Sequence, residues 1–246
     1  MKRPPADPVP WTPPDEADGD GLVGVGGDLD PAILLRAYAD GVFPWFNEGD
    51  PILWWSPDPR AVIELDGLHV SKRLTRTMRK GLFRVTLDRR FETVMRQCGE
   101  RRDEGTWVTE GMVKSYAELH RLGYAHSLET WVPLEYAIAS GRLQQIETLS
   151  DETGIWALAG GVYGVAIGGL FAAESMFHYI TDGSKVALAS LVLHLQQRGY
   201  SLFDVQMTTD HTLSMGASEI SRKSYLRRLR AATANRGVTY TVTPPG

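Results

Sequence analysis

Alternating apolar and polar positions predict a chain of short helices and strands behind a polar leader. Residues 1–20 are rich in Pro, Asp and Glu and poor in apolar side chains, so we expect a flexible lead-in there. Asp30 followed by Pro31 is typical of a helix start, and Gly41 is typical of a helix end. The aromatic and proline-rich stretch 42–60 cannot form one regular helix, because several prolines interrupt it.

Beyond residue 60 the periodicity predicts a mixed order of helices and strands. Ser71 is expected to cap a short helix that ends near Lys80 and carries its charges on one side. Residues 134–139 fit a helix or a strand, so segment 132–159 is interpreted as an insertion or a long hairpin whose role stays open. The other expected elements are strands at 83–87, 125–131 and 202–207, a twisted hairpin at 158–177, and helices at 91–98, at 110–120, at 185–197 after a Ser184 cap, and from Ser221 onward.

This order of elements predicts an α+β fold with a mixed sheet. The chain has 246 residues, of which 43% are hydrophobic, and is long enough for one large domain or two smaller ones. We expect an N-terminal domain with aromatic and proline-rich loops at 21–68. A C-terminal domain at 69–246 would contain the basic helix 71–80.

Composition narrows the class of protein. No apolar run reaches the roughly 18 residues that a membrane span needs, so we expect a cytoplasmic protein with no membrane partner. The single cysteine, Cys98, excludes an internal disulfide framework, and six scattered histidines without a zinc-binding spacing predict no metal site. A monomer is the default expectation.

Charge is distributed unevenly along this chain of net charge −4. Residues 69–102 hold eleven Lys and Arg residues against three acidic ones, which predicts a local positive patch that binds a phosphate backbone. The alternative is a solvated surface of salt-bridged helices. The residues expected to contact a nucleic-acid backbone are Lys72, Arg73, Arg76, Arg79, Lys80 and Arg84.

Carboxylates interrupt two otherwise apolar strands, Glu174 in one and Asp204 in the other. Burying a carboxylate is costly unless it is paired or lines a cleft, so both are candidates for a functional site. Asp204 and Gln206 are two positions apart, which places both side chains on one face of a strand. The alternative is that an internal Arg or Lys neutralises Asp204 or Glu174, and that the carboxylate only fixes the fold.

Three further residues fit a functional or a structural role. Trp45 and Trp107 lie beside turns, where exposed rings can stack unpaired bases of an RNA end, although a Trp more often belongs to the core. His211 fits a catalytic acid or base and equally a hydrogen-bonded structural histidine. The sequence lacks a phosphate-binding loop, a dinucleotide fingerprint and a serine nucleophile elbow, so neither ATP hydrolysis nor a nicotinamide cofactor is expected.

Seven segments follow one another in order between about residues 21 and 229. They are Phe43-Pro-Trp-Phe46, Leu53-Trp-Trp-Ser-Pro-Asp-Pro-Arg60, Glu104-Gly-Thr-Trp107, Ala125-His-Ser127, Gly161-Val-Tyr-Gly-Val165, Glu174-Ser-Met-Phe177 and Asp210-His-Thr212. Together they resemble the bacterial leucyl/phenylalanyl-tRNA–protein transferases. The resemblance implies a small N-terminal α/β domain and a C-terminal acetyltransferase-like domain. It also implies transfer of Leu or Phe, with Met as a further candidate, from aminoacyl-tRNA to the N-terminal α-amine of proteins that begin with Arg or Lys, which creates an N-degron for protein degradation.

The resemblance also implies roles for single residues. Asp204 and Gln206 would form the catalytic pair, Glu174 would lie beside the reacting groups, and Trp45 and Trp107 would flank the terminal adenosine of the tRNA. Val162 and Phe203 stand where Met and Ile are expected in the family, which leaves the preference among Leu, Phe and Met open. The apolar pocket for the transferred side chain would be lined by Val162, Phe171, Leu188, Leu191 and Phe203.

No cofactor is expected, because the co-substrate is an aminoacyl ester that is already activated. Such an enzyme has to hold an amine about 3 Å from the ester carbonyl and manage its proton. One alternative function is an acetyl-coenzyme A-dependent N-acetyltransferase, although the candidate pyrophosphate loop at 181–185 carries only one glycine. The other is a non-catalytic RNA-binding protein, which would leave the carboxylates in the apolar strands unexplained.

Overall fold

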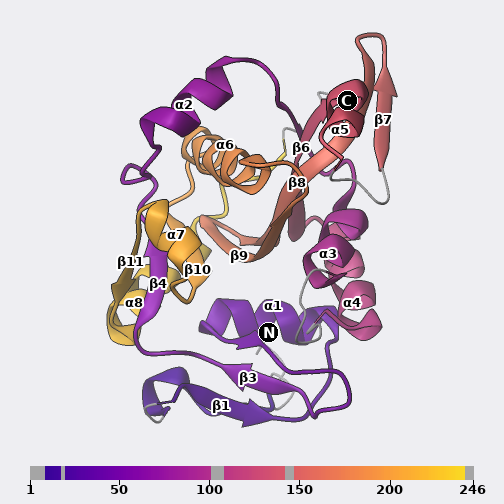
Figure 1. Cartoon of the computed structure of the whole chain (residues 1–246). Coiled ribbons are helices and arrows are strands. Elements are labelled where there is room, and N and C mark those ends of the chain that lie inside the picture. The colour runs from indigo at the N-terminus through magenta and orange to yellow at the C-terminus, as the bar shows by residue number, and fades with distance from the viewer. Residues whose placement is uncertain (1–8, 18–19, 101–107, 142–146, 242–246) are drawn as a thin grey trace.

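Two sheets organise the computed structural model, which describes residues 9–17, 20–100, 108–141 and 147–241 (Figure 1). A three-stranded sheet lies near the N-terminus, and an eight-stranded sheet forms the centre of the molecule. A short 3₁₀ helix, η1 (Pro14–Glu16), precedes the first strand. Among the described residues, no helix is both long and apolar enough to cross a membrane.

The small sheet packs beside helix α1 (Pro31–Asp40). This helix begins as predicted, because the side chain of Asp30 accepts a hydrogen bond from the backbone N–H of Ala32 at 2.8 Å. It ends at Gly41, whose φ of 83° is a left-handed conformation that favours glycine. The sheet is antiparallel in the order β1-β3-β2, with bounds β1 (Leu22–Val25), β2 (Phe43–Pro44) and β3 (Leu53–Trp55).

The large sheet runs in the order β11-β4-β10-β9-β8-β6-β5, and β7 pairs with β8 beside this path. Its pairs are antiparallel except for β9 and β10, which are parallel. This mixed sheet confirms the predicted α+β class. The acetyltransferase-like arrangement of the C-terminal domain stays a prediction. The strands are β4 (Arg60–Ile63), β5 (Arg84–Leu87), β6 (Ala125–Pro133), β7 (Thr148–Asp151), β8 (Gly154–Ile167), β9 (Leu170–His178), β10 (Leu202–Gln206) and β11 (Ala217–Ile220).

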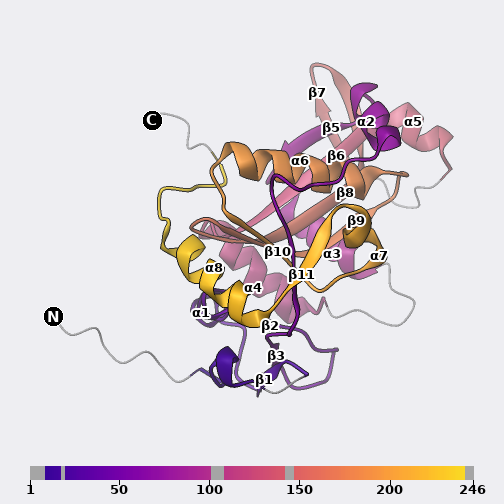
Figure 2. The same ribbon diagram turned by 90° about the vertical axis from the view of Figure 1, so that its left-hand side faces the viewer.

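Helices cover both faces of the large sheet (Figures 1 and 2). On one face, α6 and α2 share an apolar cluster with the sheet. On the other face, α1, α3 and α4 share a second cluster, and α8 packs beside them on β9, β10 and β4. The bounds are α2 (Lys72–Arg79), α3 (Phe91–Glu100), α4 (Glu110–Arg121), α5 (Leu134–Ala139), α6 (Gly183–Gln197), α7 (Asp210–Ser214) and α8 (Arg222–Ala234).

Most predicted elements are present, with two differences in detail. The ambiguous residues 134–139 form helix α5, and the rest of segment 132–159 extends the antiparallel sheet through β7 and β8. The predicted Ser184 cap is wrong: α6 begins two residues earlier, at Gly183, with Asp182 at the N-cap. The hydroxyl of Ser184 instead lies 3.3 Å from Nδ1 of His178, so it is already engaged by the neighbouring strand.

Strand β4 lies in the large sheet, although the expected division at residue 68 assigned it to the N-terminal domain. Its apolar side chains pair with β10 and β11, which come more than 130 residues later. The local pattern of apolar and polar residues contains no information about so distant a strand partner. The division into domains itself stays a prediction.

Candidate active site

The parallel pair of strands in the large sheet opens at its carboxyl end. β10 pairs with β9 from Leu202 to Asp204, and beyond this point Gln206 pairs only with Ala61 of β4. Openings at the carboxyl ends of parallel strands are common ligand sites. Here a cavity of about 320 Å³ is lined by Ala173, Glu174, Ser175, Met176, His178, Ser184, Val205, Met207, Thr209, His211 and Thr212.

Asp204 lies just behind this cavity and is completely buried. Arg60 donates to its carboxylate twice, from Nε to Oδ1 at 2.9 Å and from Nη2 to Oδ2 at 2.6 Å. The hydroxyl of Tyr225 donates to Oδ2 at 2.7 Å, and the backbone N–H of Gln206 donates to Oδ1 at 2.8 Å. An internal Arg therefore neutralises Asp204, as one of the two sequence interpretations allowed, and the carboxylate holds the backbone of Gln206 in place.

Gln206 connects this buried pair to the cavity. Its φ of 64° is a left-handed conformation that costs energy in a residue with a side chain, and such strain is often found at functional sites. The bend turns the side chain so that Nε2 donates to Oε1 of Glu174 at 2.7 Å. The structure thus brings Asp204, Gln206 and Glu174 together, as the sequence predicted.

Glu174 is the ionisable group of this trio that lines the cavity. Burial raises its pKa to about 7, the hydrogen bond from Tyr38 opposes the rise, and the charge of Asp204 adds to it. Tyr38 comes from α1, and its hydroxyl lies 2.5 Å from that of Tyr116 on α4. Tyr38 and Tyr116 were not predicted as site residues, because a buried aromatic residue on a helix gives no local indication of a distant carboxylate.

A positive surface follows α2. Four of the six residues predicted to contact a nucleic acid line one hollow of about 390 Å³, which also includes Thr75. Within the described residues, no ion pair involves these four side chains. They are Lys72, Arg76, Arg79 and Lys80.

The other two predicted contacts are engaged inside the protein. Arg73 donates to Asp182 at 2.7 Å, close to the start of α6. Arg84 pairs with Asp151 and lies over the ring of Trp156. For these two residues the salt-bridged alternative describes the structure, and their contact with a nucleic acid stays a prediction.

Family models match most of this chain. The model for leucyl/phenylalanyl-tRNA protein transferase matches residues 62–143 and 138–230, and the model for the N-terminal domain of the same transferase matches residues 27–58. The chain belongs to this family. Membership makes it an aminoacyltransferase.

Curated relatives agree with this assignment over nearly the whole length. A leucyl/phenylalanyl-tRNA–protein transferase of Magnetococcus marinus is 48% identical over 95% of this chain and 94% of the relative. The transferase of Syntrophotalea carbinolica is 44% identical over 97% of this chain and 94% of its own length. That of Syntrophobacter fumaroxidans is 49% identical over 87% of this chain and 83% of its own.

The five residues predicted to line the aminoacyl pocket gather in one apolar cluster on the α6 side of the sheet. Each is at most 1% exposed, and none is among the residues that line the cavity in the described structure. Ala173 and Val205 belong to both sets, so the cluster is continuous with the cavity. The five are Val162, Phe171, Leu188, Leu191 and Phe203, and their contact with a substrate stays a prediction.

Trp45 is a surface residue rather than part of the core. Its side chain belongs to the exposed class at 42%, and its ring lies 6.0 Å from that of Trp55. The backbone carbonyl of Trp45 accepts a hydrogen bond from Nε1 of Trp55 at 2.8 Å, which fixes the loop. Trp107 lies outside the described residues, so the stacking role of both rings stays a prediction.

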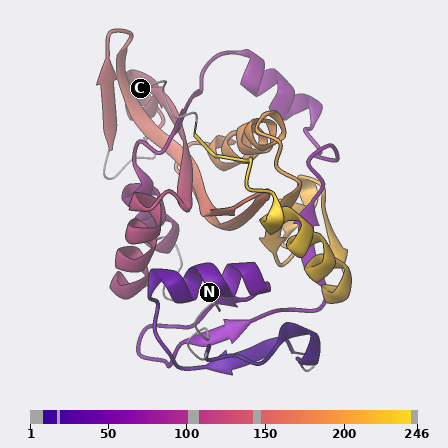
Figure 3. The ribbon, with the colours of Figure 1, turned by 180° about the vertical axis from the view of Figure 1, so that it is seen from behind.

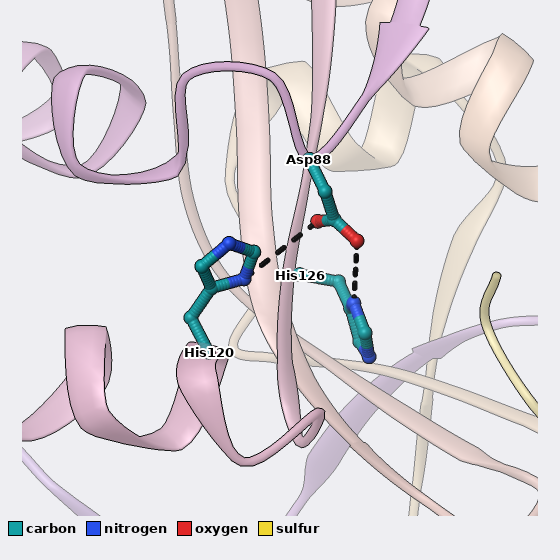
Figure 4. Close-up of side chains that lie close together, drawn as sticks. All are labelled: Asp88, His120 and His126. Carbon is teal, nitrogen blue, oxygen red and sulfur yellow. Dashed lines mark hydrogen bonds and ion pairs between the residues drawn. The ribbon is translucent and has the colours of Figure 1, made fainter.

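Asp88, His120 and His126 bring three possible metal ligands together away from the cavity (Figure 4). Nδ1 of His126 donates to Asp88 at 2.8 Å, and its Nε2 faces the carbonyl of Gly123 at 3.1 Å. Nδ1 of His120 donates to the carbonyl of Ala125 at 2.8 Å. A metal ligand needs a free lone pair, whereas the Nδ1 atoms of both histidines face oxygen atoms that can only accept a hydrogen bond. The cluster is therefore a hydrogen-bonded network that a metal would have to disrupt.

His211, the other candidate acid or base, does line the cavity. Burial lowers its pKa, and the nearby positive charges of Lys185 and His178 act in the same direction. Its Nε2 is buried with no hydrogen-bond partner among the described residues. His211 thus presents a ring nitrogen at the cavity that a bound molecule can contact.

Proposed function

We propose that this chain transfers Leu or Phe from aminoacyl-tRNA to the N-terminal α-amine of proteins that begin with Arg or Lys, and so creates an N-degron in the cytoplasm. The observation that carries the proposal is the Glu174–Gln206–Asp204 chain at the opening between β9 and β10. The names of the curated relatives support the reaction class.

We assign Glu174 as the group that accepts a proton from the attacking amine. An α-amine is mostly protonated at neutral pH, and it attacks only after it loses that proton. A carboxylate with a pKa near 7 is partly ionised there and is well matched to accept the proton. After the amine gives its first proton to Glu174, its nitrogen forms a bond to the ester carbonyl carbon and the bond from that carbon to the ribose oxygen breaks. A second proton passes from the nitrogen to the ribose oxygen, and Glu174 releases the first proton to solvent.

Gln206 and Asp204 act as positioning residues in this scheme. The amide of Gln206 holds the Glu174 carboxylate in one orientation, and Asp204 holds the backbone of Gln206. Since the aminoacyl ester is already activated, the proposed reaction needs no ATP, metal or other cofactor.

The charges on the surface support the choice of substrates. The unpaired basic side chains along α2 can bind tRNA phosphates, because such contacts depend mainly on positive charge. The carboxylate of Glu174 favours an acceptor whose N-terminal residue carries a positive charge, as Arg and Lys do. Met remains a further candidate for the transferred residue.

The test is transfer of labelled Leu from leucyl-tRNA to a peptide that begins with Arg, beside an identical peptide that begins with Ala. We expect wild type to modify only the Arg peptide, and Glu174→Gln to reduce the rate by about 10²–10⁴-fold, the range for loss of a general base. Glu152→Gln, at an exposed glutamate on the hairpin between β7 and β8, serves as the matched control and should keep full activity.

Two outcomes would contradict the proposal. If the folded wild-type protein transferred Leu to neither peptide, the proposed reaction would be wrong. Full activity of Glu174→Gln would be compatible with the proposed reaction but would contradict the role of Glu174 as its base.

A further inference from the structure

The chain after α8 returns to the large sheet and is fixed against the C-terminal end of α6 (Figure 3). Arg198 donates from Nε to the carbonyl of Thr239 at 2.9 Å and from Nη2 to its hydroxyl at 2.7 Å. Nε2 of His194 donates to the carbonyl of Tyr240 at 2.7 Å. This segment has no regular secondary structure, so these side-chain contacts hold it in place.

Tyr240 points from this segment into the apolar cluster and is 2% exposed. Its hydroxyl donates to the carbonyl of Ser127 at 3.1 Å. Its ring stacks on His126 at 4.2 Å and on Phe171 at 5.6 Å. A ring held at its hydroxyl, at its backbone and by two stacked neighbours cannot move aside easily, so it also restrains the ring of Phe171.

Tyr240 lies beside the last turn of α6, at the inner end of the predicted aminoacyl pocket. Ser184, at the start of the helix, lines the cavity, and the pocket residues Leu188 and Leu191 follow. His194, which binds Tyr240, comes last. A helix rises 1.5 Å per residue, so about 15 Å separates the cavity end from the level of Tyr240.

We propose that Tyr240 closes the inner end of the aminoacyl pocket and determines how large a transferred side chain the enzyme accepts. The inference rests on the proposed function, because it concerns the same pocket. Phe171 forms the wall, and Tyr240 prevents that wall from moving back when a larger side chain enters. A residue of the segment that follows α8 thereby controls specificity in a pocket formed by β8, β9, β10 and α6.

The experiment compares kcat/KM for tryptophanyl-tRNA and leucyl-tRNA with the same Arg-initiated peptide, using the full chain. Tyr240→Leu and Tyr240→Ala are expected to raise the Trp-to-Leu ratio by about tenfold or more, the effect of one or two methylene groups of extra space in an apolar pocket. Tyr240→Phe keeps the ring and is the matched control, so its ratio should stay within about twofold of wild type. Circular dichroism shows which variants fold, and Tyr240→Leu is included because truncating a buried aromatic to Ala destabilises a fold strongly.

Tyr240→Trp tests the opposite direction and is expected to lower the Phe-to-Leu ratio. A ratio that does not follow the size of residue 240 among the variants that fold would overturn the inference. Leucine transfer by wild type reports on the proposed function separately. Its failure would therefore be distinguished from an unchanged ratio in an active enzyme.

Discussion

The buried pair of Arg60 and Asp204 makes the role of Asp204 measurable as stability. Arg60 is 1% exposed and Asp204 is completely buried, and two hydrogen bonds join them. Asp204→Asn keeps the shape of the side chain and removes its charge, which leaves a guanidinium in the interior without a counter-charge. Removing one partner of a buried pair costs about 3–5 kcal/mol, and we expect the free energy of unfolding to fall by this amount.

Urea unfolding followed by circular dichroism measures this loss. Glu64→Gln is the matched control, because Glu64 also forms a double hydrogen bond with an arginine, Arg228, but at a half-exposed position. Water screens that pair, so the control should lose at most about 1 kcal/mol. Arg60→Met combined with Asp204→Leu removes both charges and should recover much of the stability that Asp204→Asn loses.

The same variants separate stability from activity. The double variant still lacks the acceptor for the backbone N–H of Gln206, so we expect it to fold and to transfer Leu slowly. A free energy of unfolding of Asp204→Asn that lies within about 1 kcal/mol of the wild-type value would refute the assignment of a buried ion pair. Full activity of the stable double variant would refute the positioning role of Asp204.

Five further outcomes follow from the structure. The transfer rate should rise with pH through an inflection near 7 as Glu174 ionises, and a pH profile without that inflection would exclude Glu174 as the base. The pKa of Glu174 is raised from its usual 4.5, so the protonated carboxyl stabilises the fold fully below pH 4.5 and this stabilisation is lost as the pH rises through 7. Thermal unfolding of wild type and of Glu174→Gln across this pH range measures the difference. Tyr38→Phe removes a hydrogen bond that lowers the pKa of Glu174, so the activity profile should move to higher pH, and a shift to lower pH would contradict this contact. In a filter-binding titration, Arg76→Gln should weaken tRNA binding and reduce the slope of log K against log salt concentration by about 0.9. The control Arg121→Gln removes an arginine that is paired with Glu118 on α4 and should change neither quantity. A zinc chelator such as 1,10-phenanthroline should leave the transfer rate unchanged, and inhibition that added Zn²⁺ reverses would show a metal requirement.

Local physics explains which elements the sequence could predict. Asp30 with Pro31, Ser71, Thr109 and Ser221 each combine a capping side chain with a following helical pattern, and all four cap the expected helix. Ser184 fits the same pattern but does not cap, because its hydroxyl is engaged by His178 of the preceding strand. A cap prediction depends on a side chain that is free to turn back, and that condition is set by tertiary contacts.

The candidate site was predictable only in part for a related reason. A carboxylate inside an apolar strand is visible in the sequence, and Glu174 and Asp204 were found in this way. Their partners Arg60 and Tyr38 lie more than 130 residues away from them along the chain. Arg60 ends a segment that looked like a proline-rich loop, and Tyr38 occupies an ordinary apolar position on a helix, so neither has a local signal.

These distant partners connect the N-terminal elements to the candidate site. Arg60 donates from Nη1 to the carbonyl of Gly41 at 3.1 Å, at the residue where α1 ends, and its guanidinium also lies over the ring of Phe43. The same side chain binds Asp204, so one guanidinium ties the end of α1 to the strand that carries Gln206. α1 also supplies Tyr38 to Glu174. A displacement of α1 would therefore change both the orientation of Gln206 and the pKa of Glu174, and this coupling makes the N-terminal elements part of the candidate site.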